Sequence, residues 1–448
     1  MTHDLRQLSL QNNMYTIIST IVEVLKKIIP EPVIRIFRKP YHFLLSYLFA
    51  LSYGFPAKGM TVIGVTGTKG KSTVTEMLFR VLSYAGYPTA VAGTIRFAIG
   101  DNSEPNLFKM TMPGRGFIQD FLSRAKKAGA TYAVLEVTSE STVQFRHLFL
   151  YLNALVFTNL QREHIESHGS FENYAAAKLK IGKALASSPK RPRAIIANAN
   201  DVHSAPYLAL AVEEKLPFGS DDVTDVVLGS GTVAFTYEGV AFSLSLPGSY
   251  NIMNALAVIK TAHFVGVPLQ TIADALAQIE RIPGRTERVE RGQSFQAIVD
   301  YAHTPDSLTA LYAAYPGRKI CVLGNTGGGR DTWKRPLMGQ IADENCDVVI
   351  LSDEDPYDED PDAIVSAMAA GMKREPLIIM DRREAIKEAL SRARAGDAVL
   401  ITGKGTDPYI MQAHGKKTPW SDSTVVGEEL DKLLHEYEQA QNAQTLPT

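Results

Sequence analysis

Cysteine is scarce in this chain of 448 residues, which contains only Cys321 and Cys346. Two cysteines cannot build the disulfide framework of a small secreted domain or a four-cysteine zinc site. We therefore expect both to pack as small core residues in a cytoplasmic protein. Excess charge of one sign is also lacking, because 46 basic and 48 acidic residues leave a net charge of −2. Such a balance argues against nucleic acid as the main partner.

Long hydrophobic runs are missing as well. Phe43–Phe55 is an apolar stretch of about 13 residues, whereas a helix needs ~20 to cross a bilayer. Charged residues interrupt Tyr15–Ile29, and no small-residue cleavage site follows, so a signal peptide is not predicted. Residues 1–60 carry seven Lys or Arg against three Asp or Glu. This segment is either a helical cap on the next domain, the preferred interpretation, or a peripheral contact with a membrane or a protein.

The order of apolar segments predicts an α/β fold. The β-branched run Thr61–Val65 is followed by a glycine-rich turn and by helical spacing in Ser72–Ala85. This order recurs along the chain and is typical of a parallel sheet with helices on both faces. Further strands are predicted at Tyr132–Val137, Ala154–Thr158, Ala194–Asn198, Ala297–Asp300, Lys319–Leu323, Asp347–Ser352, Leu377–Met380 and Ala398–Thr402.

Two other segments divide the chain. Val223–Leu246 is rich in glycine and β-branched residues and predicts antiparallel strands at the edge of the first sheet, followed by a long helix over Tyr250–Val265. Ile282–Arg285 is a candidate linker to a second, Rossmann-like α/β domain. The polar residues 437–448 predict a flexible tail.

A glycine-rich segment lies where phosphate-binding loops lie, between a strand and a helix. Residues 64–73 read Gly-Val-Thr-Gly-Thr-Lys-Gly-Lys-Ser-Thr. In such a loop backbone N–H groups converge on phosphate oxygens, Lys71 reaches the β- and γ-phosphates, and Ser72 binds Mg²⁺. Val65 stands where the strict motif has glycine, so this is a variant loop, with a purely structural turn as the alternative. The predicted nucleotide-binding residues here are Gly67, Thr68, Lys69, Gly70, Lys71, Ser72 and Thr73.

From about residue 58 to residue 424 the sequence resembles the Mur ligase family of peptidoglycan assembly, and within it the MurE branch. Residues 67–72 match the family's TGTxGK[ST] loop, and further motifs follow in family order. The resemblance implies an ATP-dependent ligase that adds the third amino acid of the stem peptide. It also implies a central ATP-binding domain over residues 58–282 and a C-terminal domain over 283–436, preceded by the helical segment 1–57.

Metal ligands are expected near the phosphate loop. Glu136 ends an apolar strand, from which a carboxylate projects into the crevice at the sheet edge. The resemblance makes Glu136 a ligand of one of two Mg²⁺ ions, whereas a lone acid in this place is otherwise a helix cap or an ion-pair partner. Residues 158–169 resemble the family's TNLxxDHLDxHG motif, in which His164 contacts the second Mg²⁺.

Lys178 matches the lysine that Mur ligases carry as a carbamate. A lysine held away from water beside metal ions has its ammonium form disfavoured, and the neutral amine can add carbon dioxide. The product is a carboxylate able to hold Mg²⁺. Taken without the resemblance, Lys178 is an ordinary exposed helix residue, as we expect its neighbour Lys180 to be. Lys71, Glu136, His164 and Lys178 form the predicted catalytic set.

The remaining nucleotide contacts follow from two further motifs. By the resemblance Asn251 addresses the adenine, Asn254 frames its pocket, and Arg285, Asp300 and His303 close over the nucleotide from the C-terminal domain. Arg285 is expected on a phosphate and Asp300 on the ribose hydroxyls. A helix N-cap is an equally weighted alternative for Asp300.

The resemblance places the acceptor, a UDP-linked muramyl dipeptide, on Thr111, Thr138, Gln144 and Arg146. Met112 and Glu140 depart from the family's pattern there. Residues 1–57 stand in place of the longer α/β domain that grips uridine diphosphate in the family. Either fewer contacts hold this group, or the acceptor differs.

The free amino acid is expected on the C-terminal domain. Arg330 matches the clamp for its α-carboxylate, and Asp355, Gly403 and Asp407 match further contacts. The arginine that binds the second carboxylate of diaminopimelate is absent, and seven acids lie between Asp353 and Asp362 with no basic residue. This acidity favours lysine or ornithine over diaminopimelate, unless the segment is simply a solvated loop.

The sequence therefore predicts a monomeric, cytoplasmic ligase that uses ATP, two Mg²⁺ ions and carbon dioxide bound as a lysine carbamate. The carboxylate is activated as an acyl phosphate, which the amine attacks. Two alternatives are another ligase of the superfamily, of the folylpolyglutamate, poly-glutamate or cyanophycin type, and a non-catalytic nucleotide-binding scaffold.

Overall fold

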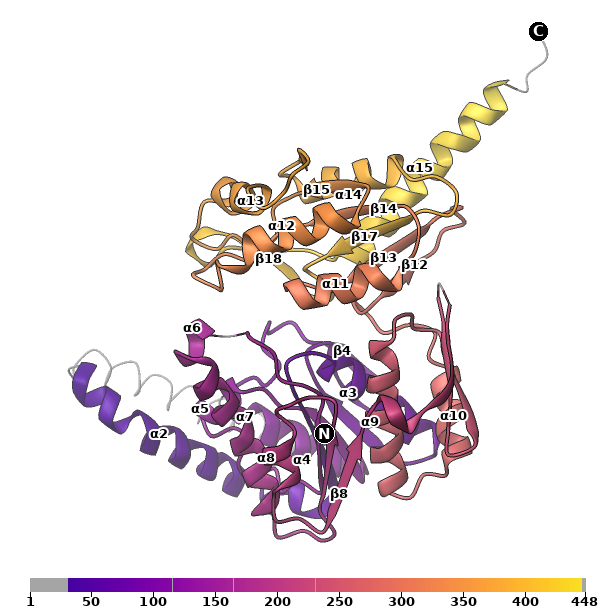
Figure 1. Cartoon of the computed structure of the whole chain (residues 1–448). Coiled ribbons are helices and arrows are strands. Elements are labelled where there is room, and N and C mark those ends of the chain that lie inside the picture. Colours follow the sequence, from indigo (N-terminus) through magenta and orange to yellow (C-terminus); the bar gives the residue numbers. More distant parts are fainter. Residues whose placement is uncertain (1–30, 115, 164, 230, 445–448) are drawn as a thin grey trace, which may run out of the picture.

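The computed structural model describes residues 31–114, 116–163, 165–229 and 231–444, with no side-chain description for 31–37 and 440–444. The chain forms two α/β lobes, and the C-terminal lobe lies above the central one in Figure 1. Two sequence predictions, the stretch Tyr15–Ile29 and His164, lie outside the described residues.

The central lobe is built on an eight-stranded mixed sheet with the order β4-β3-β2-β5-β1-β6-β7-β8. All neighbouring strands pair in parallel except β3 with β2 and with β4. The predicted parallel sheet is therefore confirmed, with two short antiparallel strands added at one edge. The strands are β1 (Thr61–Thr66), β2 (Thr89–Ala92), β3 (Arg96–Ile99), β4 (Asn102–Pro105), β5 (Tyr132–Glu136), β6 (Ala154–Phe157), β7 (Ala194–Asn198) and β8 (Glu214–Phe218).

Helices cover both faces of this sheet because its central strands are apolar on both sides. Ile63 and Val65 of β1 point into one core, and Val62 points into the other. The helices α3 (Lys71–Tyr84), α9 (Tyr250–Phe264) and α10 (Leu269–Ala277) pack on the first face. The second face carries α4 (Phe117–Lys127), α7 (Phe171–Ala186) and α8 (Ala205–Leu208), and the short helices α5 (Glu140–Val143) and α6 (Ile165–His168) lie beside α7.

The glycine-rich segment forms a sheet of its own. Its strands β9 (Thr224–Leu228), β10 (Val233–Tyr237) and β11 (Val240–Leu244) are antiparallel, as predicted, but they do not extend the eight-stranded sheet. The predicted position at the sheet edge is therefore wrong. The physical reason is the alternation in β10, whose buried Val233, Phe235 and Tyr237 form one apolar face that packs against α9 and α10.

The C-terminal lobe contains a six-stranded sheet with the order β12-β13-β17-β14-β15-β16. Its strands are β12 (Glu287–Val289), β13 (Gln296–Asp300), β14 (Lys319–Leu323), β15 (Val348–Leu351), β16 (Leu377–Ile378) and β17 (Ala398–Thr402). One face carries α11 (Pro305–Ala314), α12 (Lys334–Asn345) and α13 (Pro361–Ala369), and the other carries α14 (Arg382–Ser391) and α15 (Asp422–Gln444). A small ribbon of β18 (Tyr409–Met411) and β19 (Lys417–Pro419) completes the lobe. Helix α15 continues through Gln444, past the predicted end of the folded part at residue 437.

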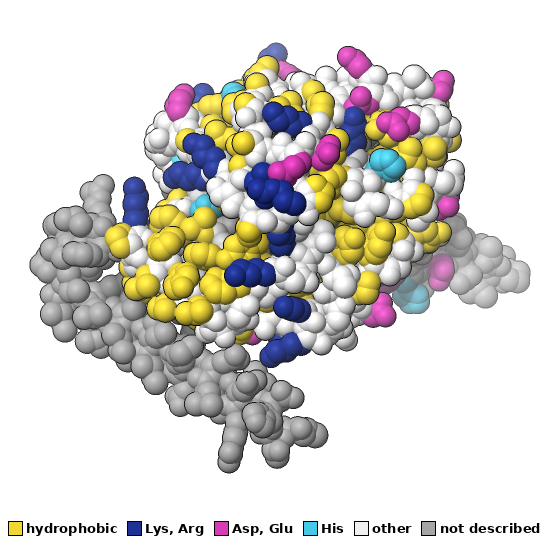
Figure 2. All heavy atoms as spheres, turned by 90° about the horizontal axis from the view of Figure 1, so that it is seen from below, with side chains coloured by type: hydrophobic (Ala, Val, Ile, Leu, Met, Phe, Trp, Pro, Cys, Tyr) yellow, Lys and Arg dark blue, Asp and Glu magenta, His cyan; other side chains and the backbone are white. Residues whose placement is uncertain are grey.

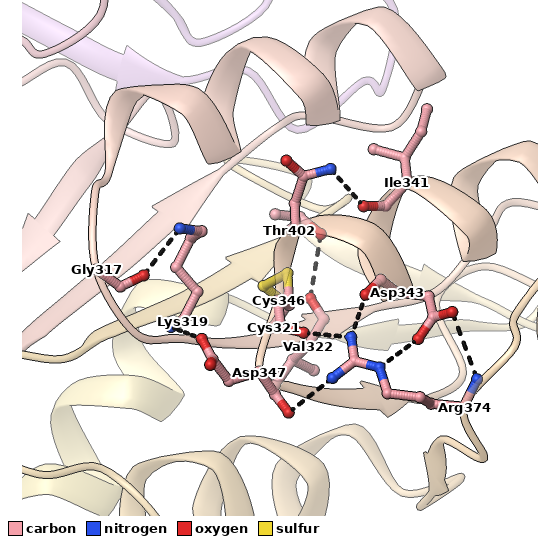
Figure 3. Close-up of a disulfide and its surroundings, with 11 residues drawn as sticks. Gly317, Lys319, Cys321, Val322, Ile341, Asp343, Cys346, Asp347, Arg374 and Thr402 are labelled. Atoms are coloured by element: carbon pink, nitrogen blue, oxygen red, sulfur yellow. Dashed lines mark hydrogen bonds and ion pairs between the residues drawn. A yellow bond between two sulfur atoms is a disulfide. The ribbon is translucent and has the colours of Figure 1, made fainter.

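The two cysteines form a disulfide. Cys321 on β14 and Cys346 after α12 are both buried in the core, as expected, but they are bonded rather than free (Figure 3). Their place in the core is confirmed, whereas the bond between them was not predicted. Cys346 lies just before β15, the strand that pairs with β14, and its Cα atom is 6.1 Å from that of Cys321. Beside the disulfide, Arg374 pairs with Asp343 and donates to the Cys346 carbonyl.

The N-terminal segment contributes the helix α2 (Glu31–Ser52), which packs on the central lobe. The Phe43 ring lies 5.9 Å from Phe145 and 6.1 Å from Phe149, and Tyr47 also contacts Phe149. The helical-cap interpretation fits these contacts. Within the described part of the chain, no helix combines the length and apolar character needed to span a bilayer.

Candidate functional site

A cavity of about 1050 Å³ opens between the two lobes. It collects most of the side chains that the sequence analysis selects, although they come from distant parts of the chain. The predicted residues that line it are Thr68, Lys69, Gly70, Lys71, Ser72, Thr73, Thr111, Glu136, Thr138, Gln144, Arg146, Asn251, Asn254, Arg285, Asp300, His303, Arg330 and Asp407. Gly67, Lys178, Asp355 and Gly403 are not among the lining residues.

The phosphate loop leads from β1 directly into α3, so the N-terminus of α3 faces the cavity. Gly70 has a φ of +80°, and a Cβ at this position would lie 2.4 Å from the Asn254 Oδ1 atom. Asn159 fixes the loop from the side, because its Oδ1 accepts a hydrogen bond from the Lys69 backbone N–H at 2.8 Å. Lys71 Nζ donates to the Thr68 carbonyl at 2.9 Å. The N-terminus of α3 and the Lys71 ammonium group thus lie together at the cavity, as the binding of an anion such as phosphate requires.

Ser72 and Glu136 meet at the start of α3. The Ser72 hydroxyl donates to Glu136 Oε2 at 3.1 Å, and the Thr94 backbone N–H donates to the same oxygen at 2.9 Å. Both side chains are buried. The structure thus brings together the two oxygen donors that the sequence predicts for magnesium.

Lys178 is buried beneath the phosphate loop. Its Nζ donates to the Gly67 carbonyl at 2.6 Å. Burial, and secondarily the positive charge of Lys71, lower the pKa of this ammonium group from its usual value to about 7, against the opposing effect of Glu140, Glu163 and Glu136. Lys180, two residues away on the same helix, is exposed, as predicted.

The two asparagines of α9 contact the loop rather than only framing a pocket. Asn251 accepts a hydrogen bond at Oδ1 from Asn254 Nδ2 at 3.0 Å and donates to the Pro247 carbonyl at 2.8 Å. The Oδ1 atom of Asn254 faces Gly70. Both side chains are therefore fixed before any ligand arrives.

From the C-terminal lobe, Arg285 and Asp300 reach the same region. Arg285 Nη2 donates to the Ser72 hydroxyl at 3.2 Å across the lobes, and its guanidinium lies 4.4 Å from the centre of the Tyr301 ring. Asp300 accepts from the backbone N–H groups of Thr286 and Ala302 at 2.6 and 2.7 Å. Asp300 is not a helix N-cap, because Thr304 caps α11.

Glu163 forms a cross-lobe contact that the sequence analysis did not assign. Its Oε1 pairs with Lys69 at 3.1 Å and lies 3.1 Å from His303 Nε2 of the other lobe. Burial lowers the pKa of His303 to about 4, and the nearby Lys69 adds to this effect. Glu163 lies in segment 158–169, whose resemblance to the family motif is the signal that could have identified it.

The predicted acceptor residues line the cavity on the central lobe. Arg146 binds the Gln144 side chain and the Met112 carbonyl. Thr111 and Thr94 share a hydrogen bond of 2.7 Å between their hydroxyls. The side chains of Thr94, Thr111, Gln144 and Arg146 form one wall of the cavity beside α2. Ser46 of α2 donates to the Gln144 carbonyl at 3.4 Å.

The residues predicted to bind the free amino acid differ in how deeply they are buried. Arg330 and Asp407 line the cavity. Asp355 is buried and accepts from Lys404 Nζ at 2.8 and 2.9 Å. Gly403 has a φ of +108°, and a Cβ there would lie 2.1 Å from Glu354 Oε2, so the positive φ and the buried Glu354 carboxylate both favour glycine. Lys109, which the sequence analysis missed, lies between Asp355 and Asp407.

The acidic segment 353–362 is largely engaged in internal contacts. Glu359 binds Arg335 at 2.7 Å and the Gly329 N–H at 2.6 Å. Asp360 caps α13, and Asp358 accepts from the His414 N–H at 2.7 Å. This segment is neither a freely solvated loop nor a wall of the cavity.

The donor set around Ser72 fits magnesium. Mg²⁺ prefers oxygen ligands and usually takes one or two carboxylates together with substrate phosphates and water. A buried serine hydroxyl and a carboxylate in contact beside a phosphate loop match this chemistry. Among the residues that the structure describes, no group of three or more His, Cys, Asp or Glu side chains is placed so that it could hold a metal ion. The role of His164 stays a prediction.

Comparison with known proteins agrees with this arrangement. The model of the Mur ligase middle domain matches residues 65–262, and that of the Mur ligase glutamate ligase domain matches residues 284–405. A UDP-N-acetylmuramoyl-L-alanyl-D-glutamate–2,6-diaminopimelate ligase of Caldanaerobacter subterraneus subsp. tengcongensis is 35% identical over 395 residues, which cover 84% of this chain and 79% of that protein. A UDP-N-acetylmuramyl-tripeptide synthetase of Roseiflexus sp. is 34% identical over 437 residues, which cover 90% and 85%.

Solved structures show the same relationship. A UDP-N-acetylmuramoyl-L-alanyl-D-glutamate–2,6-diaminopimelate ligase superposes with a TM-score of 0.58 at 30% identity, covering 84% of this chain and 79% of the other. MurF from Acinetobacter baumannii gives a TM-score of 0.64 at 20% identity, with coverages of 82% and 78%, and shares the fold. Motifs, fold, site geometry and relatives agree, and the chain therefore belongs to the Mur ligase family of ATP-dependent, amide-forming ligases.

Proposed function

We propose that this protein joins the third amino acid of the stem peptide to UDP-N-acetylmuramoyl-L-Ala-D-Glu with cleavage of ATP, as MurE-type ligases do. The observation that carries the proposal is the single cavity shared by the phosphate loop, the Ser72–Glu136 pair and Arg330. The relatives' names supply the acceptor, a muramyl dipeptide linked to UDP.

The residues of this chain suggest how the reaction is organised. The phosphate loop and Lys71 bind the triphosphate, and Arg285 adds a positive charge from the other lobe. Thr111, Gln144 and Arg146 hold the acceptor so that its carboxylate meets the γ-phosphate and forms an acyl phosphate. Magnesium, held by Ser72 and Glu136, would neutralise the charge that develops on the phosphate oxygens. The closed lobes exclude water from the acyl phosphate until the amine attacks it.

We further propose that Lys178 carries carbon dioxide as a carbamate. Its burial, its lowered pKa and its position under the phosphate loop favour the neutral amine that this addition requires. The carbamate would give the site a second negative group for a second magnesium ion.

For the free amino acid we propose lysine or ornithine, although several relatives are named for 2,6-diaminopimelate. The support is the absence of a basic residue in segment 353–362 and the position of Asp407 on the cavity wall beside Arg330. Within that segment Asp355 is the acid that contacts Lys109 of the cavity wall, and we expect it to act on the substrate side chain together with Asp407.

We propose that the protein works as a monomer in the cytoplasm and touches a membrane surface through α2. The stripe Tyr41, Leu44, Leu48 and Leu51 is spaced at helical intervals and is 38–55% exposed. Lysine and arginine side chains lie beside the apolar surface in Figure 2. Helix α2 has two exposed basic residues, Arg38 and Lys39, and no acidic residue over 38–52, which suits an anionic lipid surface.

Release of ADP by the purified full chain tests the proposal. The assay offers UDP-linked muramyl dipeptide or folate as the acceptor, each with lysine, ornithine, diaminopimelate or glutamate. We expect ADP only when the muramyl dipeptide and a dibasic amino acid are both present. Turnover with folate and glutamate would assign the protein to another branch of the superfamily, and ATP binding without acceptor-dependent turnover would indicate a scaffold.

A further inference from the structure

A lysine of the central lobe reaches into the C-terminal lobe beside Arg330. Lys109 lies in the loop between β4 and α4, and its Nζ is 2.7 Å from Asp355 Oδ2 and 3.1 Å from Asp407 Oδ2. It also lies 3.4 Å from the Tyr409 carbonyl oxygen. Lys109 is therefore a positive charge that one lobe places into a pair of carboxylates of the other.

The C-terminal lobe by itself does not balance these carboxylates. Its own cation, Lys404, is buried and lies 2.8 Å from Asp355 and 3.7 Å from Asp407. Two carboxylates and one ammonium leave one negative charge, which Lys109 offsets. A buried carboxylate that loses its partner cation is strongly destabilising. The group therefore requires a second cation whenever the cavity is closed.

The second cation lies where an amino-acid side chain can reach it. Lys109 and Asp407 line the cavity, whereas Lys404 and Asp355 are buried. The Lys109 ammonium is 6.0 Å from the centre of the Tyr357 ring, and the Arg330 guanidinium is 5.8 Å from the same centre. Arg330, which is expected to bind the α-carboxylate, and the cation that pairs with the two carboxylates thus lie near the same aromatic ring.

On the basis of the proposed function, we propose that Lys109 is a specificity-determining residue whose ammonium lies in the place that the side-chain ammonium of the incoming lysine or ornithine takes. An amino acid with its own side-chain cation can replace Lys109 and keep Asp355 and Asp407 balanced. A neutral side chain that displaces Lys109 leaves them one positive charge short. A second carboxylate adds repulsion.

The location of Lys109 on the opposite lobe lets it leave the pair. When the lobes separate, Asp355, Asp407 and Lys404 stay together on the C-terminal lobe with one net negative charge. The open site then attracts a cationic side chain while Arg330 attracts the α-carboxylate. Lys109 and the substrate therefore compete for one position during closure.

Replacement of Lys109 by methionine tests the competition, because methionine removes the charge and keeps much of the side-chain volume. Calorimetry on the full chain measures the binding of lysine, ornithine, norleucine and diaminopimelate. We expect Lys109→Met to tighten lysine and ornithine about tenfold, or ~1.4 kcal/mol, and to leave norleucine unchanged. Lys109→Arg should behave as the wild type does, and Lys183→Met, which removes an exposed lysine of α7, should change nothing.

Other outcomes overturn the proposal. Equal weakening of every amino acid would make Lys109 a structural latch, and weakening of diaminopimelate alone would make it a ligand for the second carboxylate. No change for lysine would also refute it. The binding readout is independent of turnover. If the wild type shows no acceptor-dependent ADP release, the proposed ligation fails, whereas an unchanged lysine affinity in the Lys109 variant contradicts only the competition.

Discussion

At the residue scale, the site depends on polar groups that are placed before any ligand binds. Ser72 and Glu136 come from different elements, and a hydrogen bond joins them. Asn251 and Asn254 lie one turn apart on α9 and are also joined by a hydrogen bond. Lys178 stands out because a lysine is rarely buried. Its amine donates to a carbonyl of the phosphate loop, so a change at this residue acts directly on the nucleotide site.

Replacing Lys178 by alanine should reduce ligation by at least about a hundredfold, the scale seen when a group that supports transition-state charge is removed. A small carboxylic acid added to the assay should restore part of the activity by supplying the missing carboxylate. Lys180→Ala is the matched control on the same helix and should keep full activity, because Lys180 is exposed. Full activity of the Lys178 variant would contradict a role of a Lys178 carbamate in ligation.

Carbamate formation should depend on pH in a defined direction. Burial, followed by the charge of Lys71, lowers the pKa of Lys178 from 10.5 to about 7, so the folded protein releases this proton more readily than the unfolded chain does. The neutral fraction should fall from about a half near pH 7 to about a tenth near pH 6. A carbamate signal in ¹³C spectra recorded at constant dissolved ¹³CO₂ should weaken accordingly. A signal that stays constant over this range would contradict the assigned pKa.

Local motifs made part of the site predictable from the sequence. The phosphate loop, Glu136 and Lys178 could be selected because their chemistry shows in short stretches with fixed spacing. Lys109 could not, since its partner Asp355 is 246 residues away and nothing in its own loop distinguishes it. Asp355 and Gly403, predicted as substrate contacts, are buried and do not line the cavity, because a motif match does not show how deeply a residue is buried.

At the element scale, most strands follow from apolar runs, and the exceptions have physical reasons. Strands β2, β3, β4 and β8 are short or carry polar residues, so no run of apolar residues marks them. The antiparallel pairing of β9–β11 was predicted, but the position of these strands at the edge of the first sheet was wrong. Periodicity identifies the buried face of a strand and does not show which element packs on it. The disulfide likewise depends on strand register.

Helix α2 gives a prediction at this scale. Binding of the full chain to vesicles that contain anionic lipid should be lost when Leu44, Leu48 and Leu51 are replaced by serine, because each is about half exposed and contributes apolar area to the contact. The same change at Val226, Val227 and Leu228 on β9 is the control, since these residues are also exposed. Vesicle flotation measures both. Equal vesicle binding by the two variants would refute a role of α2. Self-association of the chain that increases with protein concentration would indicate a protein contact instead.

At the scale of the whole molecule, side chains of the two lobes meet across the cavity. The polar contacts between the lobes include Arg285 with Ser72, His303 with Glu163, and Lys109 with Asp355 and Asp407. The Arg285–Ser72 contact lies at the phosphate loop. The Lys109 contact lies near Arg330, where the free amino acid is proposed to bind. Closure therefore brings nucleotide, acceptor and amino acid together in one event, which suits a reaction whose activated intermediate must be kept from water.

Transfer of an oxygen atom tests this account most directly. The carboxylate of the UDP-linked dipeptide is labelled with ¹⁸O, and the phosphate released during ligation of lysine is analysed by mass spectrometry. If the carboxylate attacks the γ-phosphate and the amine then displaces phosphate, one labelled oxygen passes to each phosphate for every amide formed. Unlabelled phosphate, or phosphate released without amide formation, would contradict acyl-phosphate ligation in the cavity between the lobes.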